Sequence, residues 1–91
     1  MLIIVKSGPD TAEGRRGVKL ARDMAGDLLL MQNAVYFAEK ERLEGFCGSV
    51  YVLDEDEKLR GVTEIQKGIK TISYHEAVEL MAEADKATGA F

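Results

Sequence analysis

Short apolar runs, each followed by a stretch with helical spacing, are the feature that most constrains the fold of this chain. The run "LIIV" over residues 2–5 has no polar alternation, which is typical of a strand buried on both faces. Three further strands are expected over residues 28–31, 49–53 and 69–72. Strand and helix therefore alternate, and this order predicts an α/β fold. We expect a four-stranded, mostly parallel sheet with right-handed crossovers and helices on both faces.

Helices are expected between and after these strands, over residues 10–24, 32–45, 54–61 and 73–91. The first is expected to begin at a capping box of Asp10 and Glu13, and the last at a second box of Ser73 and Glu76. Gly45 is expected to end the second helix. The buried face of the first helix is predicted to carry Val18, Ala21, Met24 and Ala25.

Composition excludes several classes of protein. The 91 residues leave room for one domain, which we expect to span residues 1–91. The net charge of −4 argues against direct binding of nucleic acid. One cysteine and one histidine can build neither an internal disulfide framework nor a structural zinc site, so we expect no metal and no cofactor. No run approaches the roughly 18 apolar residues of a membrane span, and no signal peptide is recognisable; a cytoplasmic protein is expected.

Ligands of parallel sheets bind beyond the carboxyl ends of the strands, so polar residues that follow a strand are candidates for a site. Such residues are Ser7, Gly8, Gln32, Asn33, Asp54, Glu55, Ser73 and Tyr74. Two aromatic residues, Tyr36 and Phe37, come soon after the second strand and indicate either a subunit interface or burial within the monomer. The candidate interface or carboxyl-edge site is therefore Gln32, Asn33, Tyr36, Phe37, Asp54 and Glu55.

The stretch "SGPDTAEG" follows the first strand and opens a helix, where backbone N–H groups can surround an anion. It contains neither a G-x-G-x-x-G pattern nor a Walker lysine, and an ordinary strand-to-helix turn explains it more simply. A small-anion or nucleotide-binding module stays open as one interpretation.

The lone thiol, Cys47, is the only nucleophilic candidate, and two interpretations of it compete. A reactive thiolate needs solvent access together with a cation or a helix N-terminus nearby, and the flanking Gly48 could expose the sulfur. Its sequence neighbours include Glu44 but no cation, and the residue enters the third strand at the amino end, away from the expected site. We therefore expect Cys47 to be a small buried hydrophobe without a catalytic role.

Four cations mark the exposed side of the first helix: Arg15, Arg16, Lys19 and Arg22. Three of them have the spacing i, i+4, i+7 and share one face. This basic face could meet an acidic partner or a phosphate backbone, or it could be a solvated surface balanced by the acids elsewhere.

Several segments together resemble one known family. "DLLLMQNAVYFA", "VYVLDEDEKLRGV", "IKTISYHEAVEL" and the tail "TGAF" are similar to the DsrH/TusB family, the smallest members of the DsrE/DsrF/DsrH group of sulfur-relay proteins. The resemblance spans nearly the whole chain and rests on a hydrophobic framework with a few polar positions. The framework positions that match are Gln32, Leu53, Glu55, Asp56, Arg60 and Gly61.

The resemblance implies a small Rossmann-like three-layer sandwich and an oligomer. The partners would be further copies of the chain, or DsrE/TusD-like and DsrF/TusC-like subunits. It also implies a non-catalytic role in persulfide transfer toward 2-thiolation of the tRNA wobble uridine or in sulfur oxidation. The sulfur-bearing cysteine of the group belongs chiefly to the sister subunit, and Cys47 matches no family cysteine motif. The expected function is therefore that of an assembly subunit rather than an enzyme. A sulfurtransferase that uses Cys47 as a persulfide carrier stays open as an alternative.

Overall fold

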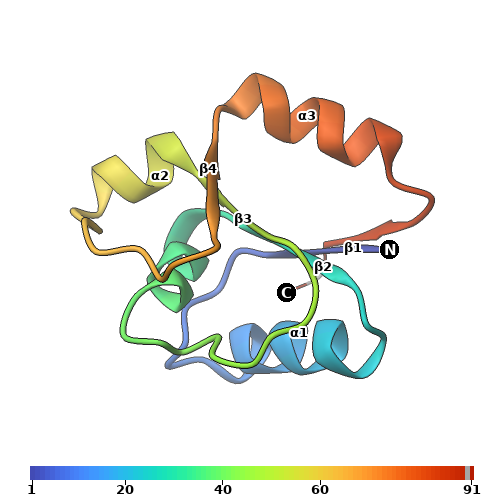
Figure 1. Ribbon diagram of the computed structural model, residues 1–91, viewed down its shortest axis with the longest axis horizontal. Helices are drawn as coiled ribbons and strands as arrows, with labels where there is room; N and C mark the ends of the chain where they lie inside the picture. Colours follow the sequence, from blue (N-terminus) through green and yellow to red (C-terminus); the bar gives the residue numbers. More distant parts are fainter. Residues whose placement is uncertain (90) are drawn as a thin grey trace.

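The computed structural model describes residues 1–89 and 91 and has three layers, with a parallel sheet in the middle (Figure 1). The strands are β1 (Leu2–Val5), β2 (Asp27–Leu30), β3 (Val50–Leu53), β4 (Lys70–Ile72) and β5 (Ala87–Thr88). Their order across the sheet is β4-β3-β2-β1-β5, and every neighbouring pair is parallel. The predicted α/β fold, with helices on both faces of a parallel sheet, is confirmed.

The sheet has five strands where the sequence predicted four. Residues 73–91 do not form one helix: α3 (Tyr74–Glu83) ends before Ala84, whose ψ of 137° is extended. The chain then returns along β1, where the Leu2 N–H donates to the Lys86 carbonyl at 2.8 Å and Leu2 pairs with Ala87. The backbone of the buried strand β1 needs hydrogen-bond partners on both sides, and β5 supplies them on the side away from β2.

The first helix, α1 (Ala12–Asp23), is capped by Thr11 rather than by the predicted Asp10. The Thr11 side chain accepts a hydrogen bond from the Gly14 N–H at 3.0 Å, which satisfies a free donor of the first turn. Val18 and Ala21 are buried as predicted. The expected burial of Met24 and Ala25 is wrong, because the helix ends at Asp23 and leaves both residues exposed.

The predicted helix over residues 32–45 is wrong in type and length. The chain forms a 3-10 helix, η1 (Gln32–Ala38), followed by turns up to residue 45. Lys40 and Glu41 have φ of 57° and 55°, the left-handed conformation that interrupts a helix. Gln66 fixes this path from a distant loop, since its N–H donates to the Ala38 carbonyl at 2.7 Å and its side chain accepts from the Leu43 N–H at 3.3 Å.

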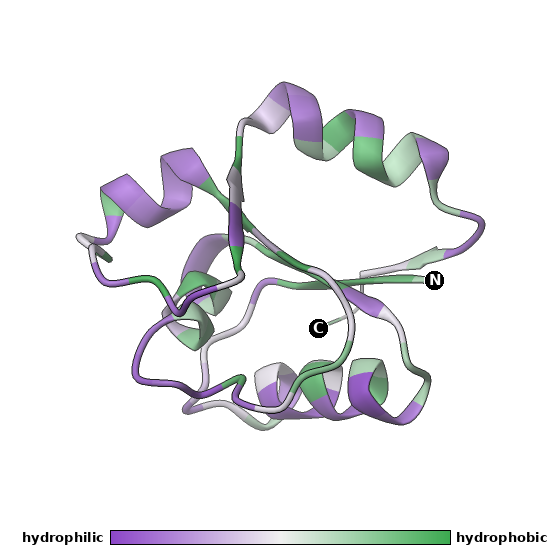
Figure 2. Ribbon diagram, viewed as in Figure 1, coloured by the Kyte–Doolittle hydropathy of each residue, from purple (hydrophilic) through white to green (hydrophobic). Residues whose placement is uncertain are grey.

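The remaining helix, α2 (Asp54–Leu59), begins directly after β3, as the acidic residues of its first turn predicted. The predicted capping box of α3 is confirmed, with Ser73 and Glu76 bonded reciprocally. α2 is largely hydrophilic, whereas β1 and the inner sides of α1 and α3 are apolar (Figure 2).

Two apolar clusters hold the layers together, one on each face of the sheet. Side chains of α1, η1 and the residue 43–65 region pack on one face around Ile3, Val5, Leu28 and Leu30. On the other face, α3 packs on Leu2, Ile4 and Leu29. Since burial of one such side chain contributes about 1.5–3 kcal/mol, the strands β1 and β2 carry much of the core.

Candidate functional site

The carboxyl edge of the sheet holds a cavity of about 450 Å³ between the loop that follows β1 and the helix η1. Residues 8–11 form one wall. The opposite wall consists of Asn33, Tyr36, Glu39 and Arg42. Three of the sequence-predicted residues, Gly8, Asn33 and Tyr36, therefore meet at one site.

The loop of residues 8–11 is held tightly against α1. The Thr11 hydroxyl donates to the Gly8 carbonyl at 2.8 Å, and the Thr11 N–H donates to the same oxygen at 3.1 Å. A Cβ on Gly14 would lie 2.3 Å from that oxygen, so only glycine permits this approach. The Gly8 carbonyl therefore faces α1 and already accepts two hydrogen bonds from Thr11. An ordinary strand-to-helix turn accounts for the stretch "SGPDTAEG".

Arg42 is a site residue that sequence reasoning missed. Its Nη1 donates to the Tyr36 carbonyl at 2.7 Å and lies 3.5 Å from Glu39 Oε1. The residues named as lining the cavity thus supply one guanidinium, two carboxylates and a phenol, but neither a thiol nor an imidazole. This donor set can bind a polar group, and it offers no strong nucleophile. Sequence reasoning missed Arg42 because it expected one α-helix through residue 45, whereas the left-handed turn at Lys40 and Glu41 brings Arg42 back toward η1.

A polar network ties the end of β2 to α2. The Gln32 N–H donates to Asp56 Oδ2 at 2.7 Å, while Arg60 Nε donates to Asn33 Oδ1 at 2.9 Å and its Nη1 lies 3.4 Å from Asp56 Oδ1. Gln32 has a φ of 51°, a left-handed conformation that costs a non-glycine residue about 1–2 kcal/mol. The hydrogen bond that the Gln32 N–H donates to the charged Asp56 carboxylate offsets this cost. Gln32, Asp56 and Arg60 therefore fix the geometry of the edge.

The other residues expected at the carboxyl edge lie apart from the cavity. Phe37 is 5% exposed and packs in the core, so its side chain is not available to a partner. Asp54 pairs with Lys58 at 3.1 Å on the surface of α2, and Glu55 is exposed there. Ser73 caps α3 beyond β4, and Tyr74 is 54% exposed on that helix.

Cys47 is exposed, so the expectation that it is a buried hydrophobe is wrong. Its sulfur lies 3.7 Å from the Gly45 carbonyl, and its residue helps to line a cavity of about 170 Å³ together with Arg22 and Phe46. The flanking glycines and the turn leave no apolar cover over the sulfur. The predicted position at the amino edge of the sheet is confirmed, because the neighbouring Ser49 N–H donates to Asp27 at the start of β2.

The basic face of α1 has internal contacts for three of its four cations. Arg15 donates to the Pro9 carbonyl at 3.1 Å, Lys19 pairs with Asp23 at 2.7 Å, and the Arg22 guanidinium lies 5.5 Å from the centre of the Phe46 ring. Arg16 is exposed on the same helix. The contacts of Arg15 and Lys19 are exposed and worth little, so this face stays available to solvent or to a partner.

The described residues contain neither a metal-site cluster nor a membrane-spanning helix. Across residues 1–89 and 91, no three histidine, cysteine or acidic residues are grouped as a metal site would require. Within the same part of the chain, no helix combines the length and the apolar character needed to cross a membrane.

Comparisons with known proteins identify a family and a similar solved structure. The family model described as "DsrH like protein" matches residues 17–87. Among solved structures, the crystal structure of the YchN protein from E. coli superimposes with a TM-score of 0.82, at 18% sequence identity and over 97% of each chain. At that identity the likeness concerns the fold alone. No curated protein matches the sequence.

Proposed function

This chain belongs to the DsrH-like family, and from that premise we propose that it is a non-catalytic subunit of an intracellular sulfur-relay complex. Family membership supports a role related to sulfur relay, and DsrH-like proteins typically work in complexes with sulfur-relay partners. The observation that carries the proposal is the family match over residues 17–87, which includes the polar network of the carboxyl edge.

The character of the carboxyl edge supports an assembly role over a catalytic one. The cavity there is lined by groups that bind polar partners, and the one thiol of the chain lies at the amino edge. Asp56 and Arg60, which match framework positions of the family, make structural bonds to Gln32 and Asn33. These residues shape a surface and are not placed to transfer a sulfur atom.

The proposed partners are DsrE/TusD-like and DsrF/TusC-like subunits, or further copies of this chain when it is isolated. The proposed process is persulfide transfer, either toward 2-thiolation of the tRNA wobble uridine or in sulfur oxidation, and the proposed compartment is the cytoplasm. In this arrangement the sister subunit carries the sulfur, while this chain completes the assembly that presents it.

Co-expression tests the assembly. The chain is produced together with the DsrE-like and DsrF-like proteins of its source organism, and the mass of the purified species is measured by native mass spectrometry. We expect a defined complex that contains all three chains. Recovery of this chain free of both partners at micromolar concentration would contradict the proposal. The variant Glu44→Ala, which changes an exposed residue outside the candidate carboxyl-edge site, serves as a control and should assemble normally.

A second candidate function is favoured by one observation, the exposure of Cys47 beside Arg22. A persulfide carrier needs a thiol that solvent and a sulfur donor can reach, and the exposed Cys47 meets this requirement. Incubation with a sulfur donor followed by intact-mass measurement separates the candidates. A mass increase of one sulfur atom that is reversed by reductant and absent in Cys47→Ser supports the carrier; an unchanged mass supports the assembly subunit.

A further inference from the structure

The face of the sheet that carries α3 is only partly covered. α3 buries Ala77 and lays Leu80 and Met81 against Leu2, Ile4 and Leu29, the residues of β1 and β2 on this face. Beside the helix, toward β3 and β4, a cavity of about 310 Å³ stays open. We term this cavity the α3 groove; its lining residues are Tyr51, Ile72, Glu76, Glu79, Leu80 and Glu83.

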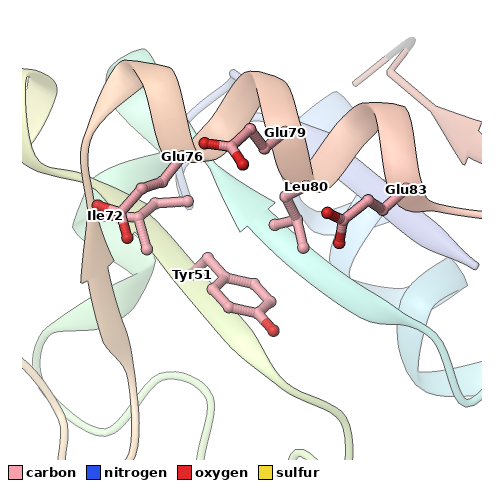
Figure 3. A pocket seen from close by; sticks show the side chains of 6 residues that line it. All are labelled: Tyr51, Ile72, Glu76, Glu79, Leu80 and Glu83. Atoms are coloured by element: carbon pink, nitrogen blue, oxygen red, sulfur yellow. The ribbon is translucent and has the colours of Figure 1, made fainter.

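The floor of the α3 groove is apolar. Figure 3 shows the Tyr51 ring lying on β3 beneath α3, with Ile72 on one side of it and Leu80 on the other. Tyr51 and Leu80 are half-buried and belong to the margin of the apolar cluster. An apolar surface left at the edge of a core is a common site of association, because covering it removes apolar area from water.

One rim of the α3 groove is acidic. Glu76, Glu79 and Glu83 have the spacing i, i+3, i+7 and form one stripe along α3 that lines the groove (Figure 3). Two residues of this stripe have partners: the Ser73 N–H donates a capping hydrogen bond to the Glu76 carboxylate, and Glu79 pairs with the exposed His75 at 2.9 Å. Lys70 also lies near the floor, with its Nζ 6.0 Å from the centre of the Tyr51 ring.

We propose that the α3 groove binds a basic amphipathic helix of a partner protein. Aliphatic side chains of that helix lie on Tyr51, Ile72 and Leu80, and its lysine or arginine residues face the three glutamates. A helix fits this space because it takes the place beside α3 in the outer layer, where neighbouring helices pack about 8–10 Å apart. The mode is that of an amphipathic helix in a groove, with apolar anchors and a complementary charged edge.

The basic face of α1 in a second copy of this chain matches the charge of the groove but not its floor. The basic face of α1 could meet the glutamates, yet none of the large apolar side chains exposed in the described chain lies within α1; these are Met24, Leu59, Tyr74 and Val78. Val18 and Ala21 of α1 are buried against the sheet. The occupant therefore needs cations and exposed aliphatic residues together. This inference does not depend on the sulfur-relay role, since it follows from the groove alone.

A model peptide tests the proposal on the full chain. The probe is a fluorescein-labelled amphipathic helix of leucine and lysine, and its counterpart has glutamate in place of every lysine. Binding is followed by fluorescence anisotropy and by backbone amide shifts in NMR spectra. The test variant is the double substitution Glu79→Gln and Glu83→Gln. The matched control is Glu41→Gln with Glu44→Gln, which makes the same change of net charge at two exposed sites outside the groove.

We expect the lysine peptide to bind and the glutamate peptide to fail, with the largest amide shifts at Tyr51, Ile72 and Leu80. The test variant should raise the Kd of the lysine peptide about fivefold, because the loss of each exposed ion pair raises the Kd by less than tenfold. The control variant should leave the Kd unchanged. Raising the salt concentration should weaken binding to the unmodified chain. Equal weakening by both variants, shifts centred elsewhere, or no saturable binding would overturn the proposal. So would self-association that covers the groove and is abolished by Arg15→Glu with Lys19→Glu.

Discussion

Replacement of Asp56 by alanine tests whether the polar network at the carboxyl edge is structural. The Asp56 carboxylate accepts the Gln32 N–H at 2.7 Å and lies 3.4 Å from the Arg60 guanidinium. A matched control lies two residues away on α2: Asp54 also pairs with a basic residue at i+4, Lys58, at 3.1 Å. Both substitutions remove one negative charge from the first turn of the same helix, so their effects on the helix dipole nearly cancel.

Asp54 and Asp56 differ in burial and in hydrogen bonding. The side chains of the Asp56 and Arg60 pair are 18% and 20% exposed, whereas those of the Asp54 and Lys58 pair are 37% and 76% exposed. A hydrogen bond to a charged group contributes about 1.5–3 kcal/mol, and partial exposure lowers the value for Asp56 to about 2 kcal/mol. An exposed pair contributes about 0.5 kcal/mol. We expect Asp56→Ala to be less stable than Asp54→Ala by about 1.5 kcal/mol, which corresponds to about 6–12 °C in Tm for a chain of this size.

Urea unfolding followed by circular dichroism measures the difference in the free energy of unfolding, with Tm as a second readout. Asp56→Asn adds a third point: its side-chain oxygen can still accept from Gln32 without a charge, so its stability should fall between those of the alanine variant and the unmodified chain. Equal stabilities of Asp54→Ala and Asp56→Ala would refute the reasoning, because the bond to Gln32 would then contribute nothing beyond an exposed ion pair.

Three further predictions follow from single features of the structure. Gly14→Ala should destabilise the chain by about 1–2 kcal/mol although alanine favours helices, because its Cβ would lie 2.3 Å from the Gly8 carbonyl oxygen; a stabilised variant in the same urea assay would show that the loop yields. Cys47 should react with a thiol reagent in the native state as fast as in urea, and a slow native reaction would mean that the sulfur is covered. Bonds from Ser73 lower the pKa of Glu76 below its ordinary value of 4.5, so its charge contributes stability above that pH and loses the contribution as pH falls through the lower folded pKa. The stability advantage over Glu76→Gln should therefore shrink below pH 4.5, and an advantage that grows with acid would contradict this sign.

The strands were predictable because their signal is local. A run such as "LIIV" has high β propensity and no polar residue, and it can form only a strand buried on both faces. The strand β5 has no such signal: Ala87 and Thr88 become a strand because β1 offers them a free edge, which lies more than 80 residues away in the sequence. The helix expected over residues 32–45 failed for a similar reason, since Gln66 bonds to the turn that replaces it.

The candidate site was predictable in part. The rule that polar residues gather where parallel strands end named Gly8 and Asn33, and the aromatic pair named Tyr36; all three line the cavity. It could not find Arg42, whose position depends on the left-handed turn at Lys40 and Glu41. The role of Asp56 needed the structure as well, because its partner Gln32 is 24 residues distant in the chain.

Sulfur transfer through the reconstituted complex tests the central claim most directly. The rate at which labelled sulfur passes from a donor to the final acceptor is measured with the unmodified chain, with Cys47→Ser, and without the chain. If this chain is a non-catalytic subunit, the complex with Cys47→Ser should transfer sulfur at the full rate. Omission of the chain should abolish both assembly and transfer. A complex that assembles with Cys47→Ser but no longer transfers sulfur would contradict the account and make Cys47 the carrier.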